Sequence, residues 1–132
     1  GSQLKTVEDI MITGNKLPFV NQNLLMSKAL KILTEKKLGI LIVIDKNKKT
    51  KGIITDGQVR RFSEKKVNFQ HLPVKEIMTS NPFSIEKNEL AAKALSIMNN
   101  KKITSLLVNN RKKSLITIGV VHIHTILKAN IA

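Results

Sequence analysis

The chain has 132 residues, of which 42% are hydrophobic and 24% are charged, a length and composition typical of one folded domain rather than a disordered segment. It contains no cysteine, which excludes disulfide bonds, thiolate zinc sites and thiol nucleophiles. Its 23 lysines and arginines against 9 acidic residues give a formal net charge of +14, which favours anionic partners such as nucleic acids, phosphorylated metabolites or a membrane surface.

The sequence disfavours two of these partners. The longest apolar run, residues 38–44, is far shorter than the ~20 residues that cross a bilayer, so we expect no membrane partner. Only three of the cations are arginines and the chain lacks tryptophan and tyrosine, so base reading and base stacking are poorly supported and nucleic acid is an unlikely partner. No signal peptide is recognisable, and Gly1-Ser2 looks like a cloning remnant, which predicts a cytoplasmic protein.

The first quarter of the chain predicts a helix, a strand and a second helix. Thr6 and Asp9 have the spacing of a capping box, which starts a short helix. Pro18 cannot continue a helix and opens an extended segment at residues 19–20. The second helix is indicated by apolar residues that recur at helical spacing, namely Met26, Ala29, Leu30 and Leu33.

The segment that follows predicts two strands and a third helix. Gly39 is expected to end the second helix, and the β-branched residues 40–44 indicate a short buried strand. Residues 45–48 are typical of a turn, so the strand that starts at Gly52 should pair with the first as a hairpin. Thr55 can then cap a helix that continues through Phe62.

The second half of the chain repeats these features in the same order about 65 positions downstream, which indicates a duplicated supersecondary unit. We therefore predict a remnant and linker at 1–5, repeats at 6–67 and 74–132, and a polar connection at 68–73. Each half is too small to bury enough apolar surface by itself, so the halves should form one body with pseudo-twofold symmetry. The matching segments are 7–11 with 74–78, 18–19 with 82–83, 28–33 with 93–98, 36–38 with 101–103, 41–43 with 106–108, and 52–54 with 119–121.

These repeated motifs resemble a tandem CBS (cystathionine β-synthase) domain pair over about residues 5–130. The resemblance rests on the openings Asp-Ile-Met at 9–11 and Glu-Ile-Met-Thr-x-x-Pro at 76–82, and on Gly-Ile-Ile-Thr-Asp at 52–56. It implies an α/β (α+β) fold of two βαββα repeats and a regulatory, non-catalytic role. Thr-Asp-Gly-x-x-Arg-Arg at 55–61 and Val-Val-His-x-His at 120–124 are similar to the C-terminal region of bacterial arabinose-5-phosphate isomerases.

The second resemblance implies a partner and a parent enzyme in the bacterial cytoplasm. An N-terminal sugar-isomerase domain would precede this pair, and the pairs would join in a homodimer. The parent would interconvert ribulose 5-phosphate and arabinose 5-phosphate to supply the Kdo sugar of lipopolysaccharide. No cofactor is expected, but a nucleotide or nucleotide-sugar such as CMP-Kdo is a candidate effector.

CBS pairs hold nucleotides where the last strand of a repeat meets its helix, and the resemblance implies candidate residues there. The family pattern is Ser or Thr, two residues, then Asp; the hydroxyl and helix N-terminus hold phosphate and the acid binds ribose. Here Gln58 stands three residues after Thr55, and His122 and Thr125 take the two places in the second half, which weakens the ribose contact. The full candidate set is Thr55, Gln58, Arg61, Thr79, His122 and Thr125.

Simpler structural roles remain open for the same residues. Thr55 can be a helix cap only, Thr79 a turn hydroxyl, and Arg61 part of a solvated helix face. His122 is better explained as a helix cap or ligand contact than as a metal ligand, because further ligands are scarce near it. The alternative functions are a dimerisation or interaction module without a ligand, a regulatory pair of another enzyme, and a nucleic-acid binder.

Overall fold

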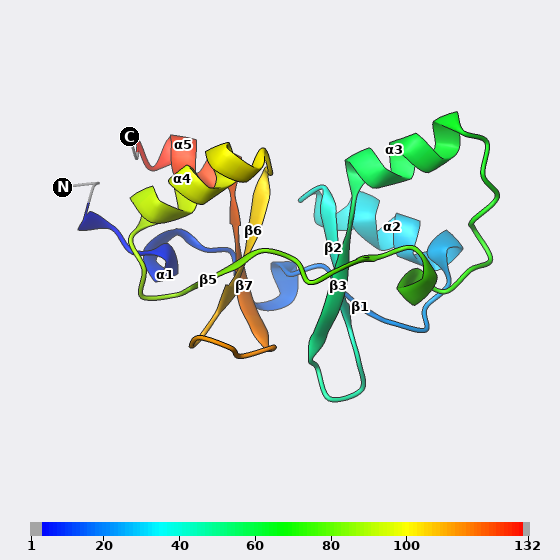
Figure 1. Cartoon of the computed structure of the whole chain (residues 1–132), viewed down its shortest axis with the longest axis horizontal. Coiled ribbons are helices and arrows are strands. Elements are labelled where there is room, and N and C mark those ends of the chain that lie inside the picture. The colour runs from blue at the N-terminus through cyan, green and yellow to red at the C-terminus, as the bar shows by residue number, and fades with distance from the viewer. Residues whose placement is uncertain (1–3, 131–132) are drawn as a thin grey trace. The chain divides into compact units, whose positions relative to one another are not determined.

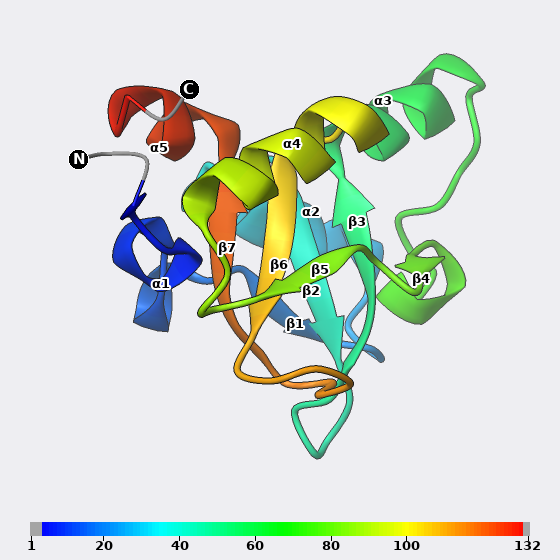
Figure 2. The same cartoon turned by 60° about the vertical axis from the view of Figure 1, so that its left-hand side comes forward.

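A computed structural model describes residues 4–130, which form two compact units (Figures 1 and 2). Unit 1 comprises residues 4–17 and 83–130, and unit 2 comprises residues 18–82. Most of the expected remnant and linker, residues 1–3, lies outside the described residues. Among residues 4–130, no helix combines the length and the apolar character needed to cross a bilayer.

Unit 2 contains a four-stranded sheet with helices packed on it. The strand order is β1-β2-β3-β4, with β1 parallel to β2 and the other pairs antiparallel. The strands are β1 (Phe19–Asn21), β2 (Ile40–Ile44), β3 (Thr50–Thr55) and β4 (Thr79–Ser80); the helices are α2 (Met26–Lys36), α3 (Asp56–Glu64) and the 3-10 turn η3 (Val74–Glu76).

Unit 1 has the same order of elements around a three-stranded sheet, β5-β6-β7. Strand β5 is parallel to β6, and β6 is antiparallel to β7, as in the hairpin of unit 2. The strands are β5 (Ser84–Glu86), β6 (Ser105–Asn109) and β7 (Thr117–His122); the helices are α1 (Val7–Ile10), α4 (Ala91–Lys101), α5 (Ile123–Lys128) and the 3-10 turn η2 (Gly14–Lys16). The prediction of two α/β repeats is confirmed.

The apolar stripe predicted for the second helix forms the core of unit 2. Met26, Ala29 and Leu33 are buried and pack with Leu41 and Ile54 of the hairpin. The corresponding residues of α4 fill the core of unit 1 in the same way: Ala91, Ala94 and Met98.

The predicted role of Gly39 as the helix terminator is wrong. Helix α2 ends at Lys36, and Lys37 adopts the left-handed conformation with φ 60°. Gly39 lies beyond the helix end with φ +70°, and its carbonyl accepts a hydrogen bond from the Asp56 amide at 3.0 Å. A Cβ at Gly39 would also lie 3.0 Å from the Asp56 carboxylate, so glycine suits the start of α3 rather than the end of α2.

The opening segment of each sequence repeat packs in the unit formed by the other repeat. In unit 2, β4 pairs with β3, and Gly52 leaves room for the carbonyl of Thr79 and the sulfur of Met78. In unit 1, Ile12 pairs with Val120 of β7 through hydrogen bonds of 2.8 and 3.0 Å. The compact units therefore begin and end at other residues than the sequence repeats.

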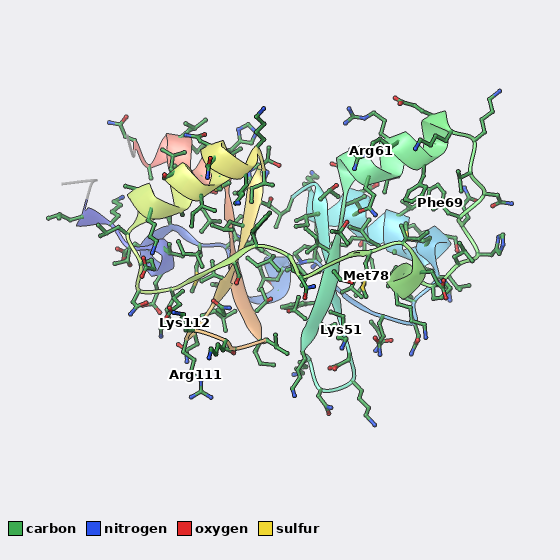
Figure 3. The ribbon with its side chains drawn as sticks, in the orientation of Figure 1. Lys51, Arg61, Phe69, Met78, Arg111 and Lys112 are labelled. Carbon is green, nitrogen blue, oxygen red and sulfur yellow. The ribbon has the colours of Figure 1, made fainter. Side chains whose placement is uncertain are left out.

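The connection at 68–73 is more than the polar linker that its composition suggested. Phe69 is only 5% exposed, and its ring centre lies 5.6 Å from that of Phe62 in the core of unit 2 (Figure 3). The carbonyls of Leu72 and Gln70 accept hydrogen bonds from Met26 and Ser27, the first amides of α2. This segment therefore caps α2 and closes the core.

Candidate functional site

The candidate site of unit 2 lies at the N-terminus of α3. Thr55 is the last residue of β3 and the N-cap of α3, and its side-chain oxygen accepts a hydrogen bond from the Gln58 amide at 3.2 Å. The prediction that Thr55 caps this helix is confirmed. The cap fixes the first turn of α3 at the edge of the sheet.

The first turn of α3 leaves one amide for a ligand. The first amides of a helix have no carbonyl partner within the helix. Here Asp56 donates to the carbonyl of Gly39 and Gln58 donates to Thr55. No described residue accepts a hydrogen bond from the Gly57 amide, so this amide and the positive end of the helix dipole can receive an anion.

Arg61 extends back along α3 toward the same first turn (Figure 3). A Cβ at Gly57 would be in ordinary contact with both groups, 3.5 Å from Nη1 of Arg61 and 4.0 Å from the Thr55 oxygen. The spacing of four residues puts Gly57 and Arg61 on one helix face. A guanidinium, a hydroxyl and a free amide therefore surround one point, a donor set that suits phosphate.

Thr79 extends this surface onto the sheet. It pairs directly with Ile53 in β4, and paired residues of antiparallel strands present their side chains on one face. Thr55 lies two residues beyond Ile53, so it shares that face. Thr79 is exposed. Both threonines therefore belong to one face of the sheet edge.

Gln58 is already engaged within unit 2. Its side-chain amide nitrogen donates a short hydrogen bond to the carbonyl of Ile77, which precedes β4. The Gln58 side chain thus ties α3 to the opening segment of the second repeat. Its amide hydrogens are partly committed, and only its carbonyl oxygen remains as an acceptor for a ligand hydroxyl.

The corresponding end of unit 1 has a different chemistry. His122 caps α5, because its Nδ1 accepts a hydrogen bond from the His124 amide at 3.2 Å. The two rings stack at 5.0 Å between centres. Burial, and secondly the neighbouring His124, lowers the pKa of His122 below its ordinary value of 6.5. Thr125 is half-buried one turn into α5.

The six candidates therefore fall into two groups. Thr55, Arg61 and Thr79 lie at one end of unit 2 beside the engaged Gln58, whereas His122 and Thr125 lie in unit 1. Among residues 4–130, no three His, Asp or Glu side chains lie close enough together to hold a metal ion.

Reasoning from the sequence did not place Gly57 and Ile77 in the candidate site of unit 2. Gly57 could have been found from its spacing to Arg61, because residues four apart on a helix are neighbours. Ile77 could not, because its contact to Gln58 joins residues that are 19 positions apart.

Comparison with curated proteins gives relatives that are longer than this chain. The arabinose 5-phosphate isomerase KdsD of Salmonella typhi is 36% identical over 128 residues, and that of Escherichia coli strain K12 is 34% identical. An uncharacterized protein of Rickettsia prowazekii, RP505, is 32% identical over 132 residues. Each match covers at least 97% of this chain, but the chain spans only 38% to 40% of the length of these relatives.

Comparison with solved structures supports the fold. The structure of CBSX2 in complex with AMP superposes with a TM-score of 0.83 at 23% identity, and 96% of each chain is covered. The CBS domain pair of MJ0100, in complex with 5'-methylthioadenosine and S-adenosyl-L-methionine, gives 0.81 at 22% identity, with 95% and 94% covered. The CBS domain model matches residues 7–65 and 74–132, and the chain belongs to the CBS domain family as a tandem pair.

Proposed function

We propose that this chain is a regulatory CBS pair whose unit 2 binds an anionic nucleotide at the N-terminus of α3. The observation that carries the proposal is the donor set at one helix end: the Thr55 hydroxyl, the Gly57 amide and the Arg61 guanidinium. A phosphate accepts from all three, and the chain's net charge of +14 strengthens its attraction. Thr79 would contact the ligand from the sheet.

Gln58 limits which nucleotides the site can hold, because it stands where the family's acid would bind the ribose. The family's acid at this place would bind both ribose hydroxyls as an acceptor, whereas Gln58 offers one acceptor, its carbonyl oxygen, and the one amide hydrogen that is not bonded to Ile77. The relatives crystallised with AMP or S-adenosyl-L-methionine make an adenosine ligand a candidate. CMP-Kdo is the second candidate, since its phosphate and carboxylate suit a basic site and its cytidine needs no adenosine contact.

The parent protein that we propose is an arabinose 5-phosphate isomerase, because 34% to 36% identity extends over nearly all of this chain. In such a protein the isomerase domain would carry the catalysis and this pair would regulate it. Regulation requires that the ligand bind one arrangement of the protein more tightly than another. A regulatory pair of a different enzyme would use the same site.

A second candidate function is an interaction module that needs no ligand. Two hydrogen bonds favour it: the bond from the Gln58 side chain to the Ile77 carbonyl in unit 2, and the bond from the His124 amide to Nδ1 of His122 in unit 1. Both occupy, within the chain, groups that a ligand would otherwise contact. Such a module would join two copies of the parent through a symmetric contact. Light scattering would then show a dimer that no nucleotide alters.

Isothermal titration calorimetry with the nucleotides AMP and CMP-Kdo, and with S-adenosyl-L-methionine as an adenosine ligand without phosphate, separates these candidates. We expect saturable heat from at least one nucleotide, and affinity about tenfold weaker in Arg61→Gln. The matched control is Arg60→Gln, which removes the same charge from the neighbouring position of α3 and should leave the affinity unchanged. Absence of heat at millimolar concentration, or equal losses in both variants, would contradict a nucleotide site here.

A further inference from the structure

Unit 1 contains a cavity at the other end of its sheet from His122. Strand β6 pairs Ser105 with His122 at one end and Asn109 with Thr117 at the other. The cavity lies beside Asn109, has a volume of about 230 Å³, and is bounded by β5, one face of α4 and the loop between β6 and β7. It is therefore separated from the N-terminus of α5 by the length of a strand.

The equivalent place in unit 2 carries larger apolar side chains. The strand registers and helices of the two units superpose element by element, which pairs Ser84 with Phe19 and Asn109 with Ile44. Two residues before α4, Glu89 corresponds to Leu24, which lies two residues before α2 and packs against the core of unit 2. Only unit 1 therefore has a small or polar residue at all three of these positions.

Asn109 holds the polar wall of the cavity together. Its side-chain nitrogen donates to the Ser84 hydroxyl at 3.3 Å and to the Ser114 carbonyl at 3.0 Å, which ties β5 to the hairpin loop. Its side-chain oxygen is buried, and no described residue donates a hydrogen bond to it. A buried acceptor without a donor is unfavourable, a cost that the isoleucine at the equivalent place of unit 2 does not carry.

The charges at the cavity are only partly paired. Lys93 and Glu89 form an ion pair at 2.7 Å on the α4 side. Within residues 4–130, no ion pair engages Lys112 and Lys113 of the hairpin loop or Glu86 of β5. Figure 3 shows Arg111 extending away from this loop. The lining thus combines two ammonium groups and one carboxylate that have no ion-pair partner among residues 4–130 with the Ser84 hydroxyl and the apolar residues Ile85 and Ile97.

We propose that this cavity binds a small phosphorylated polyol, such as a pentose phosphate. Lys112 and Lys113 would bind the phosphate as point charges, the Glu86 carboxylate would accept hydrogen bonds from the sugar hydroxyls, and the Ser84 hydroxyl would exchange hydrogen bonds with them. The volume lies below the ~300–1,000 Å³ of sites for drug-sized ligands, which limits the occupant to a small molecule. The site is independent of the nucleotide site in unit 2.

Chemical-shift titration of the 15N-labelled chain tests the proposal with ribose 5-phosphate, inorganic phosphate and ribose as separate probes. Ribose 5-phosphate should shift the amides of residues 84–89 and 109–114 saturably, and should bind about tenfold more tightly than either phosphate or ribose. Equal affinity for inorganic phosphate, or shifts spread over exposed lysines, would overturn the proposal.

Three variants and one control variant test whether binding depends on the cavity residues. Ser84→Phe and Asn109→Ile install the residues that unit 2 carries, and Lys112→Gln/Lys113→Gln removes two surface charges without touching the core; each should weaken binding about tenfold or more. Lys48→Gln/Lys49→Gln removes the same charge from the equivalent hairpin of unit 2 and should leave binding unchanged. If the lysine pairs of both hairpins weaken binding equally, general charge attraction explains the effect and the cavity proposal fails.

Discussion

Thr55 caps α3, and we propose that it also contacts a ligand there. Its oxygen caps the helix by accepting from the Gln58 amide. Thr55→Val keeps the shape of the side chain but removes this acceptor, so we expect a loss of about 1 kcal/mol in the free energy of unfolding, measured by urea denaturation. Thr55→Ser retains the oxygen and should unfold near the wild-type midpoint. Equal destabilisation by both substitutions would contradict the capping role.

His122 makes stability depend on pH in the opposite direction from a salt-bridged histidine. Its folded pKa lies below the unfolded value of 6.5, so the unfolded chain binds the proton more readily. The melting temperature should therefore fall as the pH drops below about 6.5 and continue to fall until the folded pKa is passed. Above that window the neutral ring caps α5 and this penalty is absent.

His122→Asn isolates this effect, because asparagine also caps helices but does not titrate. The variant should lose part of the decline in melting temperature between pH 7.5 and pH 5.5, a range where histidines titrate and ordinary carboxylates stay largely ionised. His71→Gln, at an exposed position of the connection, serves as the control. If His71→Gln reduces the decline and His122→Asn does not, the assignment to His122 is wrong.

Contacts between residues close together in the sequence could be predicted, whereas contacts between residues far apart in the sequence could not. Thr55 could be recognised as a cap and Arg61 as a candidate because both lie within one helix whose spacing is known. The engagement of Gln58 depends on where Ile77 arrives in space, and no local pattern encodes that. His122 as a cap was also predicted, whereas its stacking on His124 required the turn between β7 and α5.

At the scale of elements, the approach of β4 to β3 depends on Gly52. An added Cβ would lie 2.6 Å from the Thr79 carbonyl, and that carbonyl belongs to a paired strand that cannot move freely. We expect Gly52→Ala to destabilise the chain by roughly 1–3 kcal/mol, as overpacked sites do. Hydrogen exchange should also quicken in β4 and in the facing part of β3.

Gly57→Ala is the matched control because its Cβ would make only ordinary contacts, at 3.5 Å or more. Alanine is a better helix former than glycine, so this substitution should leave the free energy of unfolding unchanged or raise it by up to about 1 kcal/mol. If Gly52→Ala is as stable as Gly57→Ala, the close approach of β4 is not required for folding.

The element order could be predicted because helical and strand spacings are strong over α2, β2 and β3. Helix ends were harder to predict: Lys37 takes the left-handed conformation at the end of α2, and Gly39 lies two residues farther on, beside Asp56. The connection at 68–73 was predicted to be a polar linker from its composition, and the burial of Phe69 within it was not predicted. A single aromatic residue between polar neighbours reveals its burial only when the core that receives it is known.

At the scale of the whole chain, the duplication was predictable because both copies keep their apolar spacing about 65 positions apart. The exchange of opening segments was not, because the repeats look self-contained in sequence. The two copies differ at both proposed sites: a threonine cap, a glycine and an arginine at α3 correspond to a histidine cap at α5. At the other end of the sheet, Ser84 and Asn109 of unit 1 correspond to Phe19 and Ile44 of unit 2.

The central claim is that the first turn of α3 receives the phosphate of a nucleotide, and a chemical-shift titration with AMP and CMP-Kdo tests it most directly. With at least one of them, the amides of residues 55–61 and of Thr79 should shift saturably, with Gly57 among the largest changes, and Thr55→Val/Arg61→Gln should abolish the shifts. Unchanged amides at this helix end at millimolar concentrations of both nucleotides would contradict the claim.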